Sequence, residues 1–282
     1  MIPKKLLFQI QDEPMMNRQE QHWQQLFGHL TTEKNLWYGN WLAYSPDKEV
    51  IKSSQGIRIL QANEERSIIT HTNQFPSPDG QILEKSWQIA KSICNLADGL
   101  LHPANPQKRA LALLGQGSSA WVSQKLELGQ PFSVELFLKS ETENTSIGSI
   151  YNESGHLEKI FQIREHLGSD PEPPAPELES LSVFSGNWQG SQQSITADLT
   201  ISPVVEMETM ILDPTHGTNA MFLLVDRVVV IIPKKLNLGD NFDIIAGQII
   251  SDHHYQRLTA QYDKSGNFTR LIGELFAPKP NN

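Results

Sequence analysis

The chain has 282 residues, 38% hydrophobic and 20% charged, which fits an ordinary soluble globular protein with room for two hydrophobic cores. The net charge of −9 argues against general nucleic-acid binding, because neutralising phosphates requires clustered Lys and Arg side chains. The single cysteine, Cys94, excludes an intrachain disulfide. The sequence contains no run of about 18 apolar residues that could span a membrane. We therefore expect a cytoplasmic protein.

The first predicted element is an amphipathic helix over residues 18–30. Asn17 suits its N-cap, because a short polar side chain can accept a hydrogen bond from a backbone N–H of the first turn. The apolar residues on one face follow helical spacing, and they are Trp23, Leu26, Phe27 and Leu30.

After the helix the hydrophobic period changes to two, which is typical of strands in an antiparallel sheet. Residues 66–75 and 81–94 are predicted strands, joined by a turn at 76–80 that is rich in Pro and Gly. The later predicted strands are 111–114, 120–126, 134–138, 157–164, 205–211, 221–225, 227–232, 242–250, 254–262 and 268–276. Short strands at this spacing predict an antiparallel sandwich or barrel, and we favour a barrel because closure removes exposed edges.

Three short motifs occur twice in the same order, which indicates two tandem copies of one domain. Gly-Asn-Trp is found at 39–41 and 186–188, Lys-Leu-x-Leu-Gly at 125–129 and 235–239, and Tyr-x-x-Ser-Gly at 151–155 and 262–266. Between the copies, residues 168–177 carry four prolines and three acidic residues, so they predict an extended linker. We therefore predict a helix plus first barrel over 1–167, a Pro-rich linker over 168–177, and a smaller second barrel over 178–282.

The two Gly-x-Trp motifs, with a helix leading into the first of them, resemble the signature of lipocalin-like (calycin) β-barrels. The doubled layout resembles an uncharacterised cyanobacterial and algal family with two calycin-like domains, distantly related to phycobilin lyases. The resemblance implies an all-β, mainly antiparallel fold of two tandem barrels. It also implies that Trp41 and Trp188 close the barrel floors, with Arg164 and Arg270 as candidate stacking partners.

A ligand of such a barrel would lie inside it, against one face of each strand. The candidate ligand-binding residues are Arg58, His71, Trp87 and Trp121 in the first copy, and Tyr255 and Arg257 in the second. A barrel filled by its own side chains is the alternative, because small barrel interiors hold at most one small ligand.

We predict no catalytic residues and no metal site. His253 and His254 are adjacent on a strand, so their rings point to opposite faces. Cys94 has no recognisable histidine partner and is expected to be a small buried thiol. The Gly-rich stretch at 115–119 lacks the lysine and the helix of a phosphate-binding loop, which makes it a turn.

Three functional hypotheses follow. The first is non-catalytic binding of an apolar small molecule such as a fatty acid, a carotenoid or a bilin-like pigment, with Arg or His orienting a carboxylate. The second is a chromophore lyase or an isomerase that acts on a bound pigment or lipid, which would need an acid or base inside the barrel. The third is a protein-interaction module with solid barrels. No cofactor can be named from the sequence.

Overall fold

The computed structural model describes residues 17–77, 79–113, 118–184, 188–210, 219–251 and 254–279. Its helical elements are α1 (Arg18–Phe27), α2 (Lys91–Cys94) and the 3-10 helix η1 (Leu181–Phe184). The strands of the first half are β1 (Asn35–Tyr44), β2 (Val50–Ala62), β3 (Ile68–Pro76), β4 (Ile82–Ala90), β5 (Asn95–Leu96), β6 (Gly99–His102), β7 (Asn105–Ala112), β8 (Ser119–Ser123), β9 (Phe132–Lys139), β10 (Glu143–Tyr151) and β11 (Leu157–Leu167). Those of the second half are β12 (Trp188–Thr196), β13 (Val205–Met210), β14 (Asn219–Leu224), β15 (Val228–Pro233), β16 (Phe242–Ser251), β17 (His254–Tyr262) and β18 (Phe268–Pro278).

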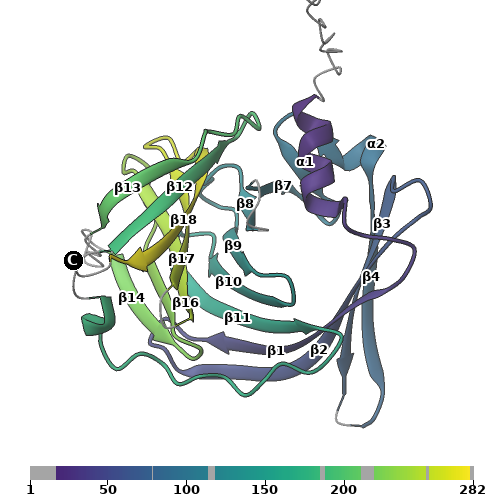
Figure 1. Ribbon diagram of the computed structural model, residues 1–282, viewed down its shortest axis with the longest axis horizontal. Helices are drawn as coiled ribbons and strands as arrows, with labels where there is room; N and C mark the ends of the chain where they lie inside the picture. Colours follow the sequence, from purple (N-terminus) through teal and green to yellow (C-terminus); the bar gives the residue numbers. More distant parts are fainter. Residues whose placement is uncertain are drawn as a thin grey trace, which may run out of the picture.

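The first eleven strands form one antiparallel sheet in the order β4-β3-β2-β1-β11-β10-β9-β8-β7-β6-β5. Because β1 pairs with β11, the first and last strands meet in the middle of the sheet, and β4 and β5 are its two edges. α2 joins these edges, and the sheet curls into a nearly closed barrel (Figure 1). The prediction of an all-β antiparallel protein is therefore confirmed at this level.

Helix α1 packs its apolar face inside this curled sheet. It begins where the sequence predicts, because the Asn17 side chain accepts a hydrogen bond from the Glu20 N–H at 2.7 Å. Trp23 and Phe27 join a cluster of buried residues that includes Ile69 of β3 and Ile89 of β4. The helix thus contributes the core of this end of the sheet (Figure 1).

The predicted strand over 81–94 is too long. Regular pairing with β3 ends at Ala90, and residues 91–94 form the single turn α2. This turn reverses the chain from one edge strand to the other, which leaves Ile93 65% exposed. A run of alternating residues cannot reveal where the chain must turn to reach the other edge of a sheet.

The second half forms a seven-stranded antiparallel sheet in the order β13-β12-β18-β17-β16-β15-β14. It repeats the pattern of the first sheet, with β12 and β13 in the places of β1 and β2, and β14 to β18 in the places of β7 to β11. Only residues 211–218 lie between β13 and β14, whereas β3 to β6 occupy that interval in the first copy. The second sheet is smaller for this reason.

The repeated motifs meet at the interface between the two sheets. The Leu126 N–H donates to the Gly266 carbonyl, and the Leu236 N–H donates to the Gly155 carbonyl, each at 2.8 Å. Both glycines have positive φ, +78° at Gly266 and +76° at Gly155, a conformation that favours glycine. The Lys-Leu-x-Leu-Gly turn of each copy therefore binds the Tyr-x-x-Ser-Gly turn of the other.

The tyrosines of these motifs also form hydrogen bonds with the opposite copy. The Tyr151 hydroxyl donates to the Pro233 carbonyl and the Tyr262 hydroxyl donates to the Ser123 carbonyl, both at 2.9 Å. The rings of Tyr262 and Phe242 stack with centroids 4.7 Å apart. They belong to one large hydrophobic cluster with members from both sheets, so the two halves share a core across a pseudo-two-fold interface.

The segment between the sheets, residues 168–180, contains no helix or strand, and it includes the predicted linker 168–177. The Asp226 N–H donates to the Ala175 carbonyl at 2.6 Å, and the Ala175 N–H donates to the Asp226 carboxylate at 3.2 Å. Glu177 forms an ion pair with Lys48. The linker is therefore fastened to both halves of the molecule.

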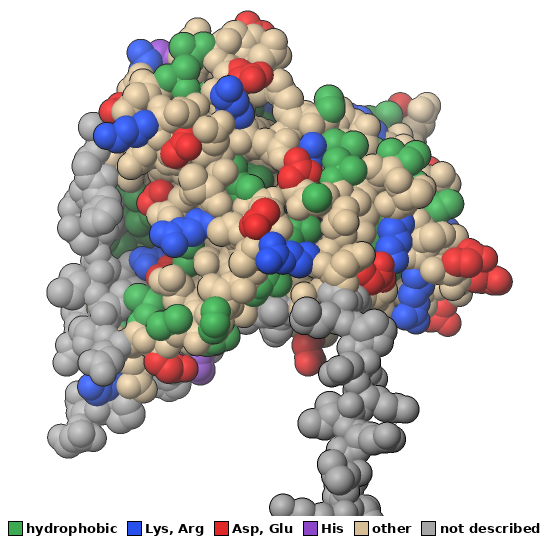
Figure 2. Space-filling view, turned by 90° about the horizontal axis from the view of Figure 1, so that it is seen from above, with side chains coloured by type: hydrophobic (Ala, Val, Ile, Leu, Met, Phe, Trp, Pro, Cys, Tyr) green, Lys and Arg blue, Asp and Glu red, His purple; other side chains and the backbone are tan. Residues whose placement is uncertain are grey.

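The surface carries charges of both signs. Figure 2 shows Lys and Arg side chains interspersed with Asp and Glu over one face of the molecule. The helices of the described residues are all too short or too polar to cross a membrane.

Candidate functional site

The inner face of the first sheet lines a cavity of about 120 Å³ that is open to solvent on one side. Helix α1 supplies Leu26 and Phe27 to its wall, and strands on several sides of the sheet supply the rest. Among the polar and aromatic lining residues are Arg58, His71, Trp121, Phe137, Lys139, Asn144 and Glu165. Trp87, also predicted from the sequence, packs on His71 with ring centroids 4.2 Å apart. Three of the four candidate residues of the first copy, Arg58, His71 and Trp121, thus line one cavity, and Trp87 contacts His71.

A buried ion pair forms one wall. Arg58 Nε of β2 lies 3.0 Å from Glu165 Oε1 of β11, and the two side chains are only 12% and 1% exposed. Asn144 Nδ2 of β10 donates to Glu165 Oε2 at 2.6 Å. Burial raises the pKa of Glu165, while the Arg58 charge and the Asn144 hydrogen bond oppose that change. A buried carboxyl group with a charged partner therefore faces the cavity.

Trp41 lies beside this pair. The Arg58 guanidinium is over its ring, 5.9 Å from the centroid, and Phe75 makes an edge contact at 4.6 Å. The basic partner of Trp41 is thus Arg58 and not the expected Arg164, whose Nε donates to Asp226 at 2.8 Å. Trp41 contributes to the wall of the first sheet next to the buried charges.

Four rings lie in a row beside the cavity, and the two at the ends of the row, His71 and Trp121, line it. His71 packs on Trp87, Trp87 lies 6.0 Å from His102, and His102 makes an edge contact with Trp121 at 4.8 Å. The rings come from β3, β4, β6 and β8 respectively. We call His71, Trp87, His102 and Trp121 the aromatic wall.

The two histidines of the aromatic wall are neutral at pH 7. Burial lowers the pKa of His71 to about 3, and the nearby Arg58 charge acts in the same direction. Burial lowers the pKa of His102 to about 4, with a further contribution from Lys108. The imidazoles therefore act as flat, uncharged surfaces, and the positive charge of the wall comes from Arg58 and its neighbouring lysines.

The strands that are unique to the first copy supply most of the aromatic wall. β3, β4 and β6 carry His71, Trp87 and His102, and these strands have no counterpart between β13 and β14. The cavity is therefore a feature of the first sheet and is not implied by the repeat.

The second-copy candidates lie in a different environment. The Tyr255 ring is fully buried beside Phe184 of η1, with centroids 4.8 Å apart, in a cluster that also contains Trp188. Arg257 makes two hydrogen bonds with Glu274, at 2.6 and 2.8 Å, and lies over the Phe276 ring. The structure places these candidates among packed aromatic rings, away from the lining of the first cavity.

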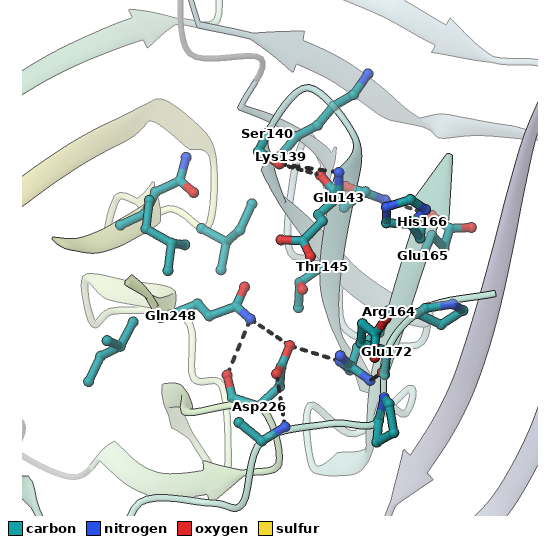
Figure 3. Close-up of a pocket in the computed structure, with 18 of the residues that line it drawn as sticks. Lys139, Ser140, Glu143, Thr145, Arg164, Glu165, His166, Glu172, Asp226 and Gln248 are labelled. Atoms are coloured by element: carbon teal, nitrogen blue, oxygen red, sulfur yellow. Dashed lines mark hydrogen bonds and ion pairs between the residues drawn. The ribbon is translucent and has the colours of Figure 1, made fainter. Parts of the chain in front are cut away.

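A larger cleft of about 510 Å³ lies where the two sheets separate beyond their shared core. Figure 3 shows Asp226 and Gln248 of the second half reaching toward Arg164 of the first. Asp226 Oδ2 accepts from Arg164 Nε and from Gln248 Nε2, both at 2.8 Å. Arg164 Nη1 also donates to the Glu172 carbonyl of the linker at 3.2 Å. These charges already neutralise one another, so we regard this part of the cleft as a junction that ties the halves together.

The other residues considered for catalysis or metal binding are less suited to a functional site. Cys94 is buried, and burial raises the pKa of its thiol, which disfavours the reactive thiolate. No cluster of three or more His, Cys, Asp or Glu suited to a metal ion occurs in the described part of the chain. His253 of the His-His pair, and residues 114–117 of the Gly-rich turn, lie outside the described residues.

Residues 19–170 match the family model described as the N-terminal domain of DUF3598, a domain of unknown function. A crystal structure of a DUF3598 protein of unknown function from Nostoc punctiforme aligns with a TM-score of 0.70 at 18% identity, over 92% of this chain and 99% of that one. This similarity shows the fold alone.

Two further solved structures align much less well. A putative outer membrane protein from Bacteroides fragilis has a TM-score of 0.21 at 9% identity, over 94% of this chain and 100% of that one. A mutant porin from Rhodopseudomonas blastica has a TM-score of 0.18 at 9% identity, over 86% and 99%. Similarities at this level carry no argument about this protein. No curated protein matches the chain.

Proposed function

This chain belongs to the DUF3598 family, and we propose that it binds a small, largely apolar molecule without catalysis in the cavity of its first sheet. The observation that supports this proposal is that the rings of Trp37, His71, Trp121 and Phe137 and the buried Arg58–Glu165 pair line one cavity. Ligand pockets are typically apolar and aromatic surfaces with a few placed polar groups that fix orientation. The first copy is the binding unit in this proposal, and the second copy supports it.

The proposal keeps the calycin-like identity that the sequence resemblance suggests. A nearly closed antiparallel sheet with a helix packed inside one end suits such a barrel, and its interior is where a ligand would bind. The relationship to phycobilin lyases is a weaker part of the proposal, and it rests on the sequence motifs alone.

Glu165 favours a lyase or isomerase as a second candidate function. Its carboxyl group faces the cavity, and burial raises its pKa, as an acid or base in such a reaction would require. In that case Glu165→Gln would abolish turnover of a bound pigment or lipid while ligand binding persisted. If binding alone is the function, no turnover will accompany binding in the wild-type protein.

Native mass spectrometry combined with absorbance tests the binding proposal. The full chain is purified from a pigment-producing host, together with an Ala110→Leu variant that places extra atoms in the cavity. We expect the wild type to carry an added mass that is lost on denaturation, and the variant to carry none. An added mass that the variant retains in full would place the ligand elsewhere and contradict the proposal.

A further inference from the structure

The size of the cavity limits its ligand. At about 120 Å³ it is smaller than the typical drug-sized pocket of roughly 300–1,000 Å³. An engineered apolar cavity of about 150 Å³ is known to hold one benzene molecule. A single ring with a small substituent therefore fits within this space, whereas most of a fatty acid, a carotenoid or a bilin would have to extend out of its open mouth.

The shape of the lining favours a flat ligand. His71 and Trp121 of the aromatic wall line the cavity together with the rings of Phe27, Trp37 and Phe137, and the His71 imidazole is neutral at pH 7. Aromatic rings pack against such surfaces in offset or edge-to-face arrangements, which contribute beyond the area they bury.

The charges on the inner face favour an anion. Arg58, Lys139 and Glu165 line the cavity directly. Glu135 lies opposite Trp121, and Lys108 lies opposite Ser123, two residues along β8 from Trp121, so both share the inner face. Three cations thus face two carboxylates, and burial lowers the pKa of both lysines because their charges are incompletely compensated.

The buried polar atoms of this region that lack a hydrogen-bond partner include both donors and acceptors. The acceptors, Asn144 Oδ1 and Glu165 Oε1, belong to residues that line the cavity. Nε1 of Trp41 and Nε1 of Trp87 are buried and have no hydrogen-bond partner, and Arg58 Nε contacts Glu165 without hydrogen-bond geometry. A buried donor without a partner costs free energy that an acceptor on a ligand can recover. Among the described residues with an unpaired buried donor, Arg58 lines the cavity, so Arg58 is the group that the oxygens of a ligand carboxylate would reach.

We infer that the ligand is a single-ring aromatic carboxylate, whose ring lies against the aromatic wall and whose carboxylate binds Arg58. Lys139, which lines the same end of the cavity beside Trp37, provides a second positive charge. This inference rests on the proposed function and adds the chemical class of the ligand. It distinguishes the protein from a carrier of long lipids or of linear pigments.

Calorimetric titration with benzoate and benzamide tests the inference, because the two share a ring and differ in charge. We expect the wild type to bind benzoate about tenfold or more tightly than benzamide, the ratio that one charge-assisted hydrogen bond gives. Arg58→Gln should remove this preference. Arg257→Gln is the matched control, because Arg257 is also a buried arginine paired with a glutamate, but in the second sheet. It should leave the preference unchanged.

The wild-type comparison does not depend on whether the Arg58 variant folds. Equal affinity for benzoate and benzamide would overturn the anionic class and leave the binding proposal intact. Binding of cis-parinaric acid, a long-chain probe, with no binding of benzoate would overturn the single-ring class alone. Failure of all three probes to bind would overturn the inference. The proposed function is decided separately, by whether the added mass seen in native mass spectrometry disappears in the Ala110→Leu variant.

Discussion

The Arg58–Glu165 pair links β2 to β11 across the inner face of the first sheet. Both side chains are buried, so each depends on the other for compensation of its charge. Removing one partner of a buried pair leaves the other charge unpaired, which typically costs about 3–5 kcal/mol. The pair is therefore a structural requirement of the cavity as well as a part of its chemistry.

Replacing Glu165 with Gln should lower the free energy of unfolding by about 3–5 kcal/mol, because it leaves the Arg58 charge buried without a counter-ion. Urea denaturation measures this change. Glu158→Gln is the control, since Glu158 and Lys159 form an exposed pair at 3.6 Å, and its effect should stay within about 1 kcal/mol. Equal effects of the two substitutions would contradict the importance of the buried pair.

Three buried histidines predict how stability depends on pH. Burial lowers the folded-state pKa of His22 to about 4, and those of His71 and His102 to about 3 and about 4. An unfolded histidine has a pKa near 6.5, so below that pH the unfolded chain binds more protons than the folded protein. Stability should therefore be intact above about pH 6.5 and fall as the pH decreases toward 4.

The variant His22→Gln isolates one of these contributions. His22 Nε2 accepts a hydrogen bond from the Ala112 N–H at 3.1 Å, and a glutamine oxygen can accept without titrating. The free energy of unfolding should fall less steeply between pH 6.5 and 4.5 in the variant than in the wild type. Identical slopes for both proteins would contradict the assignment of a buried, neutral His22.

The residues of the cavity could be predicted only in part from the sequence. His71 lies in the predicted strand 66–75, whereas Arg58 lies outside every predicted strand and was a candidate only as a cation able to orient a carboxylate. Glu165 stands between Arg164 and His166, so nothing in the local pattern separates the inward carboxylate from its outward neighbours. His102 ends a four-residue strand that is too short to show a period. Their roles depend on contacts between distant strands.

At the scale of elements, the existence and the start of helix α1 were indicated by its apolar stripe and its N-cap, because both signals are local. The helix ends at Phe27, three residues before the predicted end at Leu30. The strand alternation located most strands for the same reason. α2 and the strands β1, β2, β5, β6, β10 and β12 have no counterpart among the predicted elements. The short β5 and β6 carry no period, and their existence follows from the need to connect two edges of one sheet. Local patterns predict elements that are long enough to carry a period.

The two Ser-Gly turns provide a test at this scale. A Cβ at Gly266 would lie 2.9 Å from Leu126 Cβ, and one at Gly155 would lie 2.7 Å from the Leu236 carbonyl oxygen. Gly266→Ala and Gly155→Ala combine this clash with the strain of a positive φ, so each should cost about 2–4 kcal/mol of unfolding free energy.

Gly129→Ala is the matched control for these two substitutions. Gly129 also has a positive φ, +87°, but a Cβ there would meet nothing within 4 Å. Its cost should be confined to backbone strain, about 1 kcal/mol, in the same urea denaturation measurement. If all three variants lost equal stability, contact between the two copies would not explain why the motif is repeated.

At the scale of the molecule, the two sheets share one hydrophobic core, with aromatic residues of both motif sets in contact. The sequence indicated two copies but not their mutual packing, because a repeat says nothing about which faces meet. The predicted domain boundaries at 167 and 178 remain a prediction. The shared core makes the stability of each half depend on the other half.

A shared core predicts cooperative unfolding. Differential scanning calorimetry of the full chain should show a single transition, with a calorimetric enthalpy close to the van't Hoff enthalpy, because neither half can lose its interface and keep its core. Tyr262→Phe, which removes the hydrogen bond to Ser123, should lower the midpoint without splitting the transition. Two resolved transitions would mean that the halves fold independently.

The central claim is that the ligand site lies in the first sheet, and methyl NMR during a titration tests it most directly. The ligand is benzoate, or cis-parinaric acid if benzoate does not bind. The account predicts shifts at methyl groups that line the cavity, namely Leu60, Ile89, Leu100 and Ala110, and none at Val229, Ile231 and Ile249 in the second sheet's aromatic cluster. Shifts confined to the second set would place the site in the wrong half of the molecule and contradict the account.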